Sequence, residues 1–150
     1  MIRRRIPVRD DRMILQLIRS ELLPYTNRTF PGMTIDRHIL QERLSGLTTY
    51  VCSRNGLHTV GFVSCLTEDG TLHIDMIAID RKAQGKGYGS ALMGAAERFG
   101  LRRGCQESVL YVDQQNRGAQ RFYRRKGYAL VSYLEGLQCY EMRKPLRSLS

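Results

Sequence analysis

The sequence has few cysteines and no metal-binding or redox spacing among them. Its 150 residues contain four cysteines, with no C-x-x-C pair and no neighbouring histidine, at Cys52, Cys65, Cys105 and Cys139. This spacing predicts neither a zinc knuckle nor a redox motif. We therefore expect no metal site, and four free thiols that are mostly buried in a reducing compartment.

Targeting and membrane signals are also missing from the sequence. The basic N-terminus MIRRRIPVRDD is not followed by an apolar h-region, and no apolar run approaches the length that spans a bilayer. Low-complexity tracts and repeats are absent as well. We accordingly expect a soluble, cytoplasmic protein without a membrane partner.

Acidic residues are scarce relative to basic ones. The chain has 24 Lys and Arg against 14 Asp and Glu, which gives a formal net charge of +10. This balance favours anionic partners such as phosphates, nucleic acid or acidic lipid, without choosing among them. Because a chain of this length usually forms one domain, we expect a single domain over residues 1–150.

Hydrophobic periodicity predicts the element order β-α-α-β-β-β-α-β-α-β-β. A short strand over residues 1–9 precedes a helix that Asp10 caps and Pro24 ends, and residues 24–34 are expected to form a loop. A second helix is expected between Thr34, its cap, and Gly46, its C-terminal stop.

The middle of the chain carries hairpin signals. Asn55-Gly56 and Asp69-Gly70 separate the segments TTYVCSR, HTVGFVSCLTE and TLHIDMIAID, which predicts three consecutive antiparallel strands. A glycine-rich loop and helix, the strand SVLYVD, a helix from Asn116 and two further strands complete the order. The strands that end at Ile79 and Asp113 are joined through a helix and should be parallel neighbours.

The glycine-rich segment QGKGYGS lies between the strand that ends at Ile79 and the following helix. Ligands collect at the carboxyl ends of strands in such sheets. Gly87 and Gly89 leave the backbone N–H groups of the turn free to bind an anion, and the helix dipole adds partial positive charge. The segment therefore predicts a phosphate-bearing ligand.

Two familiar phosphate-binding motifs do not fit this segment. A P-loop requires Ser or Thr after the lysine, and Lys86 is followed by glycine. A dinucleotide fingerprint requires a third glycine or alanine where Ser90 stands, and the antiparallel hairpins upstream argue against it.

A third motif fits. Residues 79–92 resemble the Q/R-x-x-G-x-G/A motif of the GCN5-related N-acetyltransferase (GNAT) family, with Gln84, Gly87 and Gly89 on the motif positions, although Arg81 stands where members frequently carry proline. NRGAQRFYRRKGY, residues 116–128, is similar to the family's downstream N-x-x-A-x-x-F-Y-x-x-x-G-[FY] segment. The resemblance spans residues 71–128. It implies a mixed α/β fold with a mostly antiparallel sheet of about seven strands, about four flanking helices and splayed parallel fourth and fifth strands.

The resemblance also implies a chemistry. It implies that acetyl-CoA, the co-substrate, gives its acetyl group to an amine acceptor by direct attack in a ternary complex. Tyr123 would protonate the departing thiolate, and the N–H of Ile77 would stabilise the oxyanion. Backbone groups on the strand would bind the pantetheine arm, and the loop amides would bind the pyrophosphate. The implied cofactor-binding residues are Ile77, Ala78, Ile79, Gln84, Gly85, Lys86, Gly87, Tyr88, Gly89, Ser90, Asn116, Ala119 and Tyr123.

The general base is not fixed by the resemblance. An amine is normally protonated at neutral pH, so the reaction needs a proton acceptor. Asp75 and His73 lie two apart on one predicted strand and are expected to share a face with Ile77. Both are candidates, although an ordinary paired carboxylate and an exposed strand histidine would give the same sequence.

The acceptor is not named by the sequence. Residues 25–34 and 133–138 are expected to shape its pocket. An arginine stripe on the last helix is either an exposed face or a contact for the 3′-phosphate or an acidic partner, at Arg117, Arg121, Arg124 and Arg125. No nucleic-acid motif accompanies it. A catalytically silent acyl-CoA-binding regulatory domain and a nucleic-acid-binding protein stay open as alternatives, and so does a homodimer.

Overall fold

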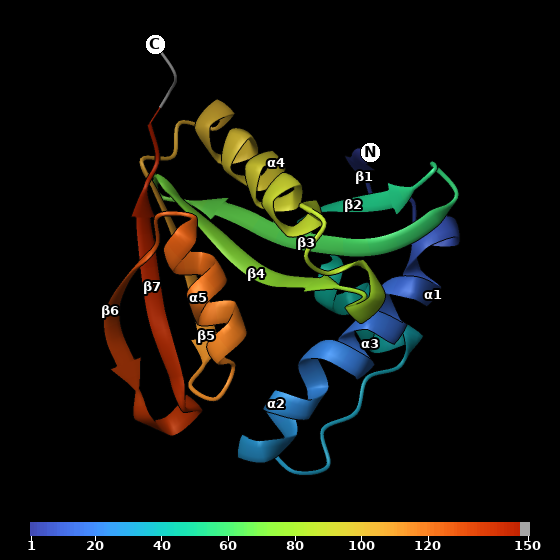
Figure 1. Ribbon diagram of the computed structural model, residues 1–150, viewed down its shortest axis with the longest axis horizontal. Helices are drawn as coiled ribbons and strands as arrows, with labels where there is room; N and C mark the ends of the chain where they lie inside the picture. Colours follow the sequence, from blue (N-terminus) through green and yellow to red (C-terminus); the bar gives the residue numbers. More distant parts are fainter. Residues whose placement is uncertain (148–150) are drawn as a thin grey trace.

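The structure is a computed structural model that describes residues 1–147, and its centre is a seven-stranded sheet (Figure 1). The strands follow the order β1-β2-β3-β4-β5-β7-β6, and only β4 and β5 are parallel. Their bounds are β1 (Ile2–Arg4), β2 (Thr48–Arg54), β3 (His58–Glu68), β4 (Thr71–Ile79), β5 (Glu107–Asp113), β6 (Ala129–Leu134) and β7 (Cys139–Pro145). The predicted mixed, mostly antiparallel α/β fold is confirmed.

Helices cover both faces of this sheet. Their bounds are α1 (Pro7–Leu17), α2 (Leu23–Thr29), α3 (Arg37–Leu44), α4 (Tyr88–Arg102) and α5 (Arg117–Arg125), with a π-helical turn η1 (Ile18–Leu22) and 3₁₀ turns η2 (Arg81–Ala83) and η3 (Glu135–Leu137). In Figure 1, α4 and α5 lie in front of the sheet, and α1 and α3 lie behind it. Each face has its own buried cluster, one around Leu92 of α4 and one around Ile14 and Leu40 of α1 and α3.

The two predicted hairpins are present, and their turns have the required backbone. Asn55 and Gly56 have φ values of 55° and 71°, and Asp69 and Gly70 have 50° and 78°. Consecutive positive φ angles match the right-handed twist of the flanking strands, and Asn-Gly and Asp-Gly adopt them at low cost. These turns therefore join β2 to β3 and β3 to β4.

The first helical segment is longer than predicted. Pro24 was expected to end it, but α1, η1 and α2 follow one another directly and Pro24 lies in the first turn of α2. Proline is compatible with that position because the N–H it lacks needs no intrahelical acceptor. The prediction of a loop from residue 24 was therefore wrong up to Thr29.

The predicted helix caps at Asp10 and Thr34 were also wrong. Ile6 precedes α1, with Pro7 as its first residue, and Asp36 caps α3 by accepting the Ile39 N–H at 2.9 Å. Gly46 follows the end of α3 with a φ of 78°, as expected for a helix stop.

Asp10 instead ties α1 to the sheet. Its buried carboxylate accepts two hydrogen bonds from Arg3, at 2.7 and 2.8 Å, and one from the Ile6 N–H at 2.7 Å. Thr59 of β3 donates a fourth at 2.9 Å. Desolvation raises the pKa of Asp10, but the Arg3, Ile6 and Thr59 donors outweigh it and bring the pKa below its usual value. Asp11 and Arg5 form a second, parallel pair at 2.6 Å.

Strands β4 and β5 are paired at one end only. Their register covers Thr71 with Glu107, Leu72 with Ser108 and His73 with Val109, after which neither strand pairs with the other. The two strands diverge from this point in Figure 1. The implied splay of the parallel pair is thus confirmed.

A β-bulge on β4 changes which side chains face which layer. The register between β3 and β4 shifts so that Asp75 is the extra residue, and an extra residue reverses the alternation that follows it. Ile77 consequently packs with Ile74 in the cluster under α4, whereas Asp75 bonds to Arg43 of α3 on the other face. The expectation that Ile77 shares a face with Asp75 was wrong.

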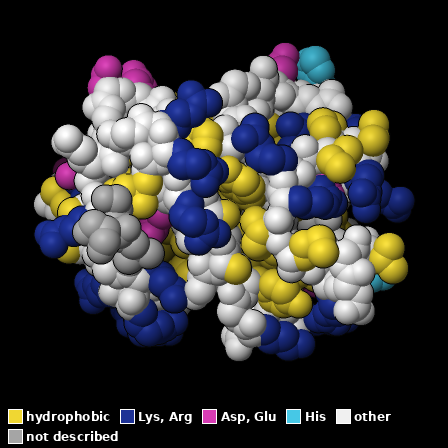
Figure 2. Space-filling model, turned by 90° about the horizontal axis from the view of Figure 1, so that it is seen from above, with side chains coloured by type: hydrophobic (Ala, Val, Ile, Leu, Met, Phe, Trp, Pro, Cys, Tyr) yellow, Lys and Arg dark blue, Asp and Glu magenta, His cyan; other side chains and the backbone are white. Residues whose placement is uncertain are grey.

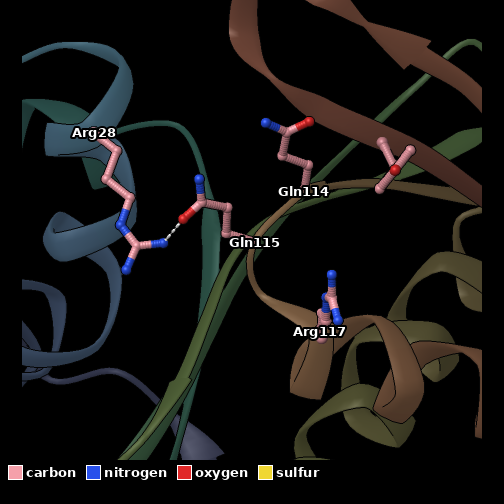
Figure 3. Close-up of a pocket in the computed structure, with 5 residues that line it drawn as sticks. Arg28, Gln114, Gln115 and Arg117 are labelled. Atoms are coloured by element: carbon pink, nitrogen blue, oxygen red, sulfur yellow. Dashed lines mark hydrogen bonds between the residues drawn. The ribbon is translucent and has the colours of Figure 1, made fainter.

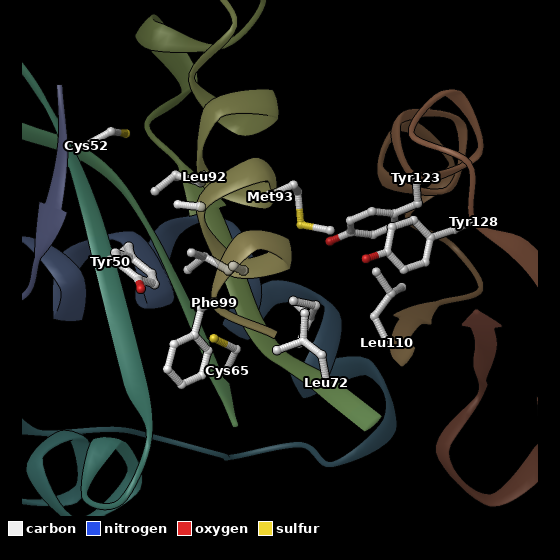
Figure 4. Packing of buried hydrophobic residues seen from close by; sticks show 14 of the residues in the cluster. Tyr50, Cys52, Cys65, Leu72, Leu92, Met93, Phe99, Leu110, Tyr123 and Tyr128 are labelled. Carbon is white, nitrogen blue, oxygen red and sulfur yellow. The ribbon is translucent and has the colours of Figure 1, made fainter. Parts of the chain in front are cut away.

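The four cysteines are free, and three of them are buried. Burial raises the pKa of Cys52 to about 11 and that of Cys65 to about 12, so both remain neutral thiols. Figure 4 shows Cys65 beside Phe99, in the core under α4. These thiols behave as small apolar core residues, as predicted.

The Asp10 carboxylate gives a direct test of the packing of α1. Asp10→Asn is expected to lower the free energy of unfolding by about 3–5 kcal/mol, because Arg3 then lacks its buried partner. Since the pKa of Asp10 is lowered by folding, its contribution is complete above the unfolded-state pKa and is lost as the pH falls through the folded-state pKa. Urea titrations should show the difference between the proteins narrowing below about pH 4.

The matched control is Asp69→Asn, at an exposed turn position whose positive φ asparagine tolerates. It should change the free energy of unfolding by no more than about 0.5 kcal/mol. An equal loss in the two variants would contradict the role given to Asp10.

Candidate active site

A cleft of about 600 Å³ lies where β4 and β5 separate. Its walls come from η1 and α2, from the end of β4, from the loop that enters α4, and from α5. Apart from Lys86, every residue that the sequence implied for cofactor binding lines it: Ile77, Ala78, Ile79, Gln84, Gly85, Gly87, Tyr88, Gly89, Ser90, Asn116, Ala119 and Tyr123. Segments far apart in sequence therefore meet at one site.

The first turn of α4 presents free backbone donors to this cleft. Gly87 is the residue before the helix and has a φ of 89°, a left-handed conformation that side chains disfavour. The first intrahelical bond is donated by Ala91, so the N–H groups of Tyr88, Gly89 and Ser90 have no acceptor within the described chain. Three free N–H groups at a helix N-terminus form a site for an anion.

Gly89 also lets α5 approach α4 closely. A Cβ at this position would lie 3.1 Å from Cζ of Phe122, and Phe122 itself lines the cleft. Gly89, the second motif glycine, therefore allows Phe122 to pack against α4 in addition to leaving the amides accessible.

Basic side chains lie in the same part of the cleft as the free N–H groups of α4 or close to it. Arg81, Arg125 and Lys126 line it, so one member of the predicted arginine stripe reaches the site while Lys86 remains exposed outside it. Arg121 and Arg124 are exposed and do not line the cleft. Figure 2 shows Lys and Arg side chains spread over a whole face of the molecule, so the basic surface is not confined to α5.

The end of β4 that no longer pairs with β5 forms one long wall. Ile77, Ala78 and Ile79 lie beyond the last β4–β5 pair. The Ile79 carbonyl accepts a hydrogen bond from the Gln84 side chain at 3.0 Å, and the same amide nitrogen donates to Glu21 at 3.2 Å. Gln84 thus links the glycine loop, β4 and η1, which gives this motif position a structural role.

Tyr123 places a neutral phenol in the cleft. Its side chain is 7% exposed, and its ring makes edge contacts with Phe122 and Tyr128 at centroid distances of 5.4 and 6.0 Å. Figure 4 shows the rings of Tyr123 and Tyr128 next to Met93. Burial raises the pKa of Tyr123 far above its usual value, so the hydroxyl stays protonated and able to donate.

Asn116 is the cap of α5, the helix that was predicted to start at this residue. Its side-chain oxygen accepts the Ala119 N–H at 3.2 Å, and both residues line the cleft. The cap fixes the start of the helix that carries Tyr123 two turns later.

The two candidate bases lie outside the cleft lining. Asp75 bonds to Arg43 at 3.1 Å and accepts from Ser64 at 3.4 Å, and His73 is the last β4 residue that pairs with β5. Proton transfer to either from the cleft would require intervening water.

The contribution of η1 to the cleft was not predicted from the sequence. Glu21 and Leu22 of η1 and Tyr25 of α2 line the cleft. Their apolar spacing is typical of an ordinary α-helix, and a π-turn, which is frequent at functional sites, has no local sequence signature here. Among the described residues, Glu21 is the only acidic residue that lines the cleft.

Within residues 1–147, no group of three or more His, Cys, Asp or Glu side chains is arranged to hold a metal ion. The helices of that part of the chain are too short or too polar to cross a bilayer.

Comparisons with known proteins agree with this geometry. The pattern of the acetyltransferase (GNAT) family matches residues 14–128. An uncharacterised N-acetyltransferase of Methanocaldococcus jannaschii is 32% identical over 94 residues, which are 58% of this chain and 41% of that protein. The chain thus spans well under half the length of this curated relative.

Solved structures are similar over the whole chain. Ard1 from Thermoplasma volcanium has a TM-score of 0.79 at 19% identity, covering 99% of this chain and 98% of its own. A PaiA N-acetyltransferase from Thermoplasma acidophilum, in complex with coenzyme A, has a TM-score of 0.78 at 16% identity, covering 97% and 99%. At these identities the likeness shows the fold.

Gly87 provides a test of the anion site. Gly87→Ala strains the turn at a φ of 89° and should displace the free amides, raising the Kd for coenzyme A about tenfold or more. Isothermal titration calorimetry measures this Kd. Gly104→Ala is the matched control, since Gly104 has a φ of 80° and lies beyond the other end of α4. Both variants should lose similar thermal stability, and equal weakening of coenzyme A binding by both would contradict the assignment.

Proposed function

The chain belongs to the acetyltransferase (GNAT) family, and from this premise we propose that it transfers the acetyl group of acetyl-CoA to a primary amine by direct attack in a ternary complex. The observation that supports this most is the joint lining of one cleft by the free amides of α4 and the phenol of Tyr123. An anion site and a proton donor in one cleft are what a thioester attached to a phosphorylated carrier requires.

Different residues along the cleft would bind different parts of acetyl-CoA. The amides of Tyr88, Gly89 and Ser90 would hold the pyrophosphate, with Arg81, Arg125 and Lys126 as neighbouring positive charges. The unpaired backbone around Ile77 would bind the pantetheine as an added strand, with its N–H facing the developing oxyanion.

Proton transfers complete the reaction. When acetyl-CoA is bound, its thioester supplies an activated acetyl group, and the bond to sulfur breaks as the amine nitrogen forms the new amide. Tyr123 then gives its proton to the departing thiolate, and the second proton that the nitrogen loses as the amide forms restores the phenol, which burial keeps protonated at rest. Asp75 takes the proton from the amine through water, and His73, two residues earlier on β4, is the alternative acceptor.

A cytoplasmic location and a homodimer stay predictions. The silent acyl-CoA-binding domain and the nucleic-acid-binding protein are the competing functions, and transfer of the acetyl group to an amine would distinguish the enzyme from both.

Tyr123→Phe tests the proton donor. The variant should lower kcat about 10²-fold or more with little change in the Kd for coenzyme A, because only the hydroxyl is lost. Thiol release with a panel of amine acceptors measures the rate. Tyr111→Phe, at a 51% exposed position on β5, is the matched control and should keep the wild-type rate. Coenzyme A binding without transfer to any amine, unaffected by Tyr123→Phe, would point to the silent domain.

Asp75→Asn tests the proton acceptor. It should lower kcat/KM at neutral pH by about 10²-fold, and the loss should shrink at high pH, where the amine is already unprotonated. Arg43→Gln removes the ion pair with Asp75 but keeps the carboxylate. Equal losses in the two variants at every pH would mean that Asp75 is structural, and a loss in His73→Gln alone would assign the base to His73.

A further inference from the structure

A second pocket, of about 520 Å³, lies beside the cleft (Figure 3). It is lined by Arg28 of α2, Gln114 and Gln115 after β5, Arg117 at the start of α5, and Tyr140 of β7. In Figure 3 the guanidinium of Arg28 reaches across to Gln115 from the opposite wall. The pocket therefore lies between α2 and the loop that leads into α5.

The polar side-chain groups that this pocket leaves free can all donate hydrogen bonds. The side-chain oxygen of Gln115 already accepts from Arg28, and that of Gln114 accepts from the Tyr133 hydroxyl at 2.8 Å. The side-chain amide nitrogens of both glutamines make no hydrogen bond within residues 1–147, and Arg28 uses one of its five N–H donors. A ligand that matches such a lining is one that only accepts hydrogen bonds.

The charge of the pocket is positive and uncompensated. Arg28 and Arg117 form no ion pair within the described chain, unlike Arg3, Arg5 and Arg43. The nearest carboxylate along the chain, Asp113, is engaged by the Gln115 backbone N–H at 2.8 Å. Two guanidinium groups without a carboxylate favour a bidentate oxyanion.

The pocket borders the cleft, because lining residues of the two are neighbours on both walls. Tyr25 lines the cleft, and the guanidinium of Arg28, one helical turn later, lies 5.4 Å from the centre of its ring. On the opposite wall Asn116 lines the cleft between two residues that line the pocket. One elongated molecule can thus occupy both spaces.

The helical run also sets the separation between opposite charges. Glu21 faces the cleft and Arg28 faces the pocket, at positions roughly 10 Å apart along a helix axis. An ammonium near Glu21 and a carboxylate near Arg28 would therefore be several bonds apart in one molecule.

We propose that the acceptor is a primary amine that carries a carboxylate several bonds away, and that Arg28 and Arg117 bind this carboxylate. This inference rests on the proposed function. The carboxylate belongs either to a small ω-amino acid or to an acidic side chain near the amino terminus of a peptide. The chemistry that recognises it is the same in both cases.

The test compares acceptors that differ only in the carboxylate. Glycine, 4-aminobutanoate and 6-aminohexanoate are paired with alkylamines of matching length, and the peptide Ala-Glu-Ala-amide is paired with Ala-Gln-Ala-amide. At saturating acetyl-CoA, kcat/KM should favour the longer carboxylates by about tenfold or more over their neutral partners, and glycine should show no such preference. A preference confined to one pair type identifies the source of the carboxylate.

Variants connect this preference to the pocket. Arg28→Gln should bring the carboxylate-to-neutral ratio close to one, and Arg28→Lys should retain part of it, because lysine keeps the charge without the fork. Arg54→Gln, at an exposed position of β2 outside both pockets, removes the same charge and should leave the ratio unchanged. The preference should also weaken as ionic strength rises.

A binding measurement separates this inference from the proposed function. In the presence of coenzyme A, calorimetry should show 6-acetamidohexanoate, a product analogue, binding at least about tenfold more tightly than N-hexylacetamide, with the difference lost in Arg28→Gln. Transfer to neutral and carboxylate acceptors at equal rates, or equal binding of the two analogues, overturns the inference. If no amine is acetylated, the proposed function is overturned. The binding of the two analogues then still shows whether the pocket binds a carboxylate.

Discussion

The incomplete pairing of β4 with β5 is the constraint on which the site depends. Two parallel strands that share three register positions and then separate leave backbone groups of β4 without a strand partner. Unpaired backbone polar groups need hydrogen-bond partners, so a wall of this kind suits an extended, amide-containing ligand. The bulge at Asp75 lies just past the last pair and turns Ile77 toward the core under α4. The opening thus results from the strand pairing of the sheet and not from a particular side chain.

The helices that border the opening fix what it can do. α4 begins at the carboxyl end of β4 with three free N–H groups, and α5 begins after β5 with the Asn116 cap and carries Tyr123. The continuous run α1–η1–α2 closes the third side, and Asp10 anchors the start of that run to β1 and β3. The Asp10 cluster thus fixes the N-terminal end of the helical run that carries Glu21 and Arg28.

The sequence predicted those parts of the structure that local chemistry determines. Positive φ angles at Gly87 and at the Asn-Gly and Asp-Gly turns require the residues that stand there, and the two spaced motifs identified the family. Predictions from the sequence were wrong where tertiary contacts determine the local structure. Pro24 fits a helix start as well as a helix end, and the bulge at Asp75 has no local signal, so the face of Ile77 was misassigned. The pocket between Arg28 and Gln115 joins residues that only the fold brings together.

The central claim is that the unpaired end of β4 and the first turn of α4 together bind the donor. Amide hydrogen exchange with and without coenzyme A tests it most directly, because it reports on individual backbone N–H groups. The account predicts that coenzyme A slows exchange at residues 77–79 and 88–90, and leaves residues 71–73, already paired with β5, unchanged. Saturating coenzyme A that leaves exchange at residues 77–79 and 88–90 unaltered would contradict it.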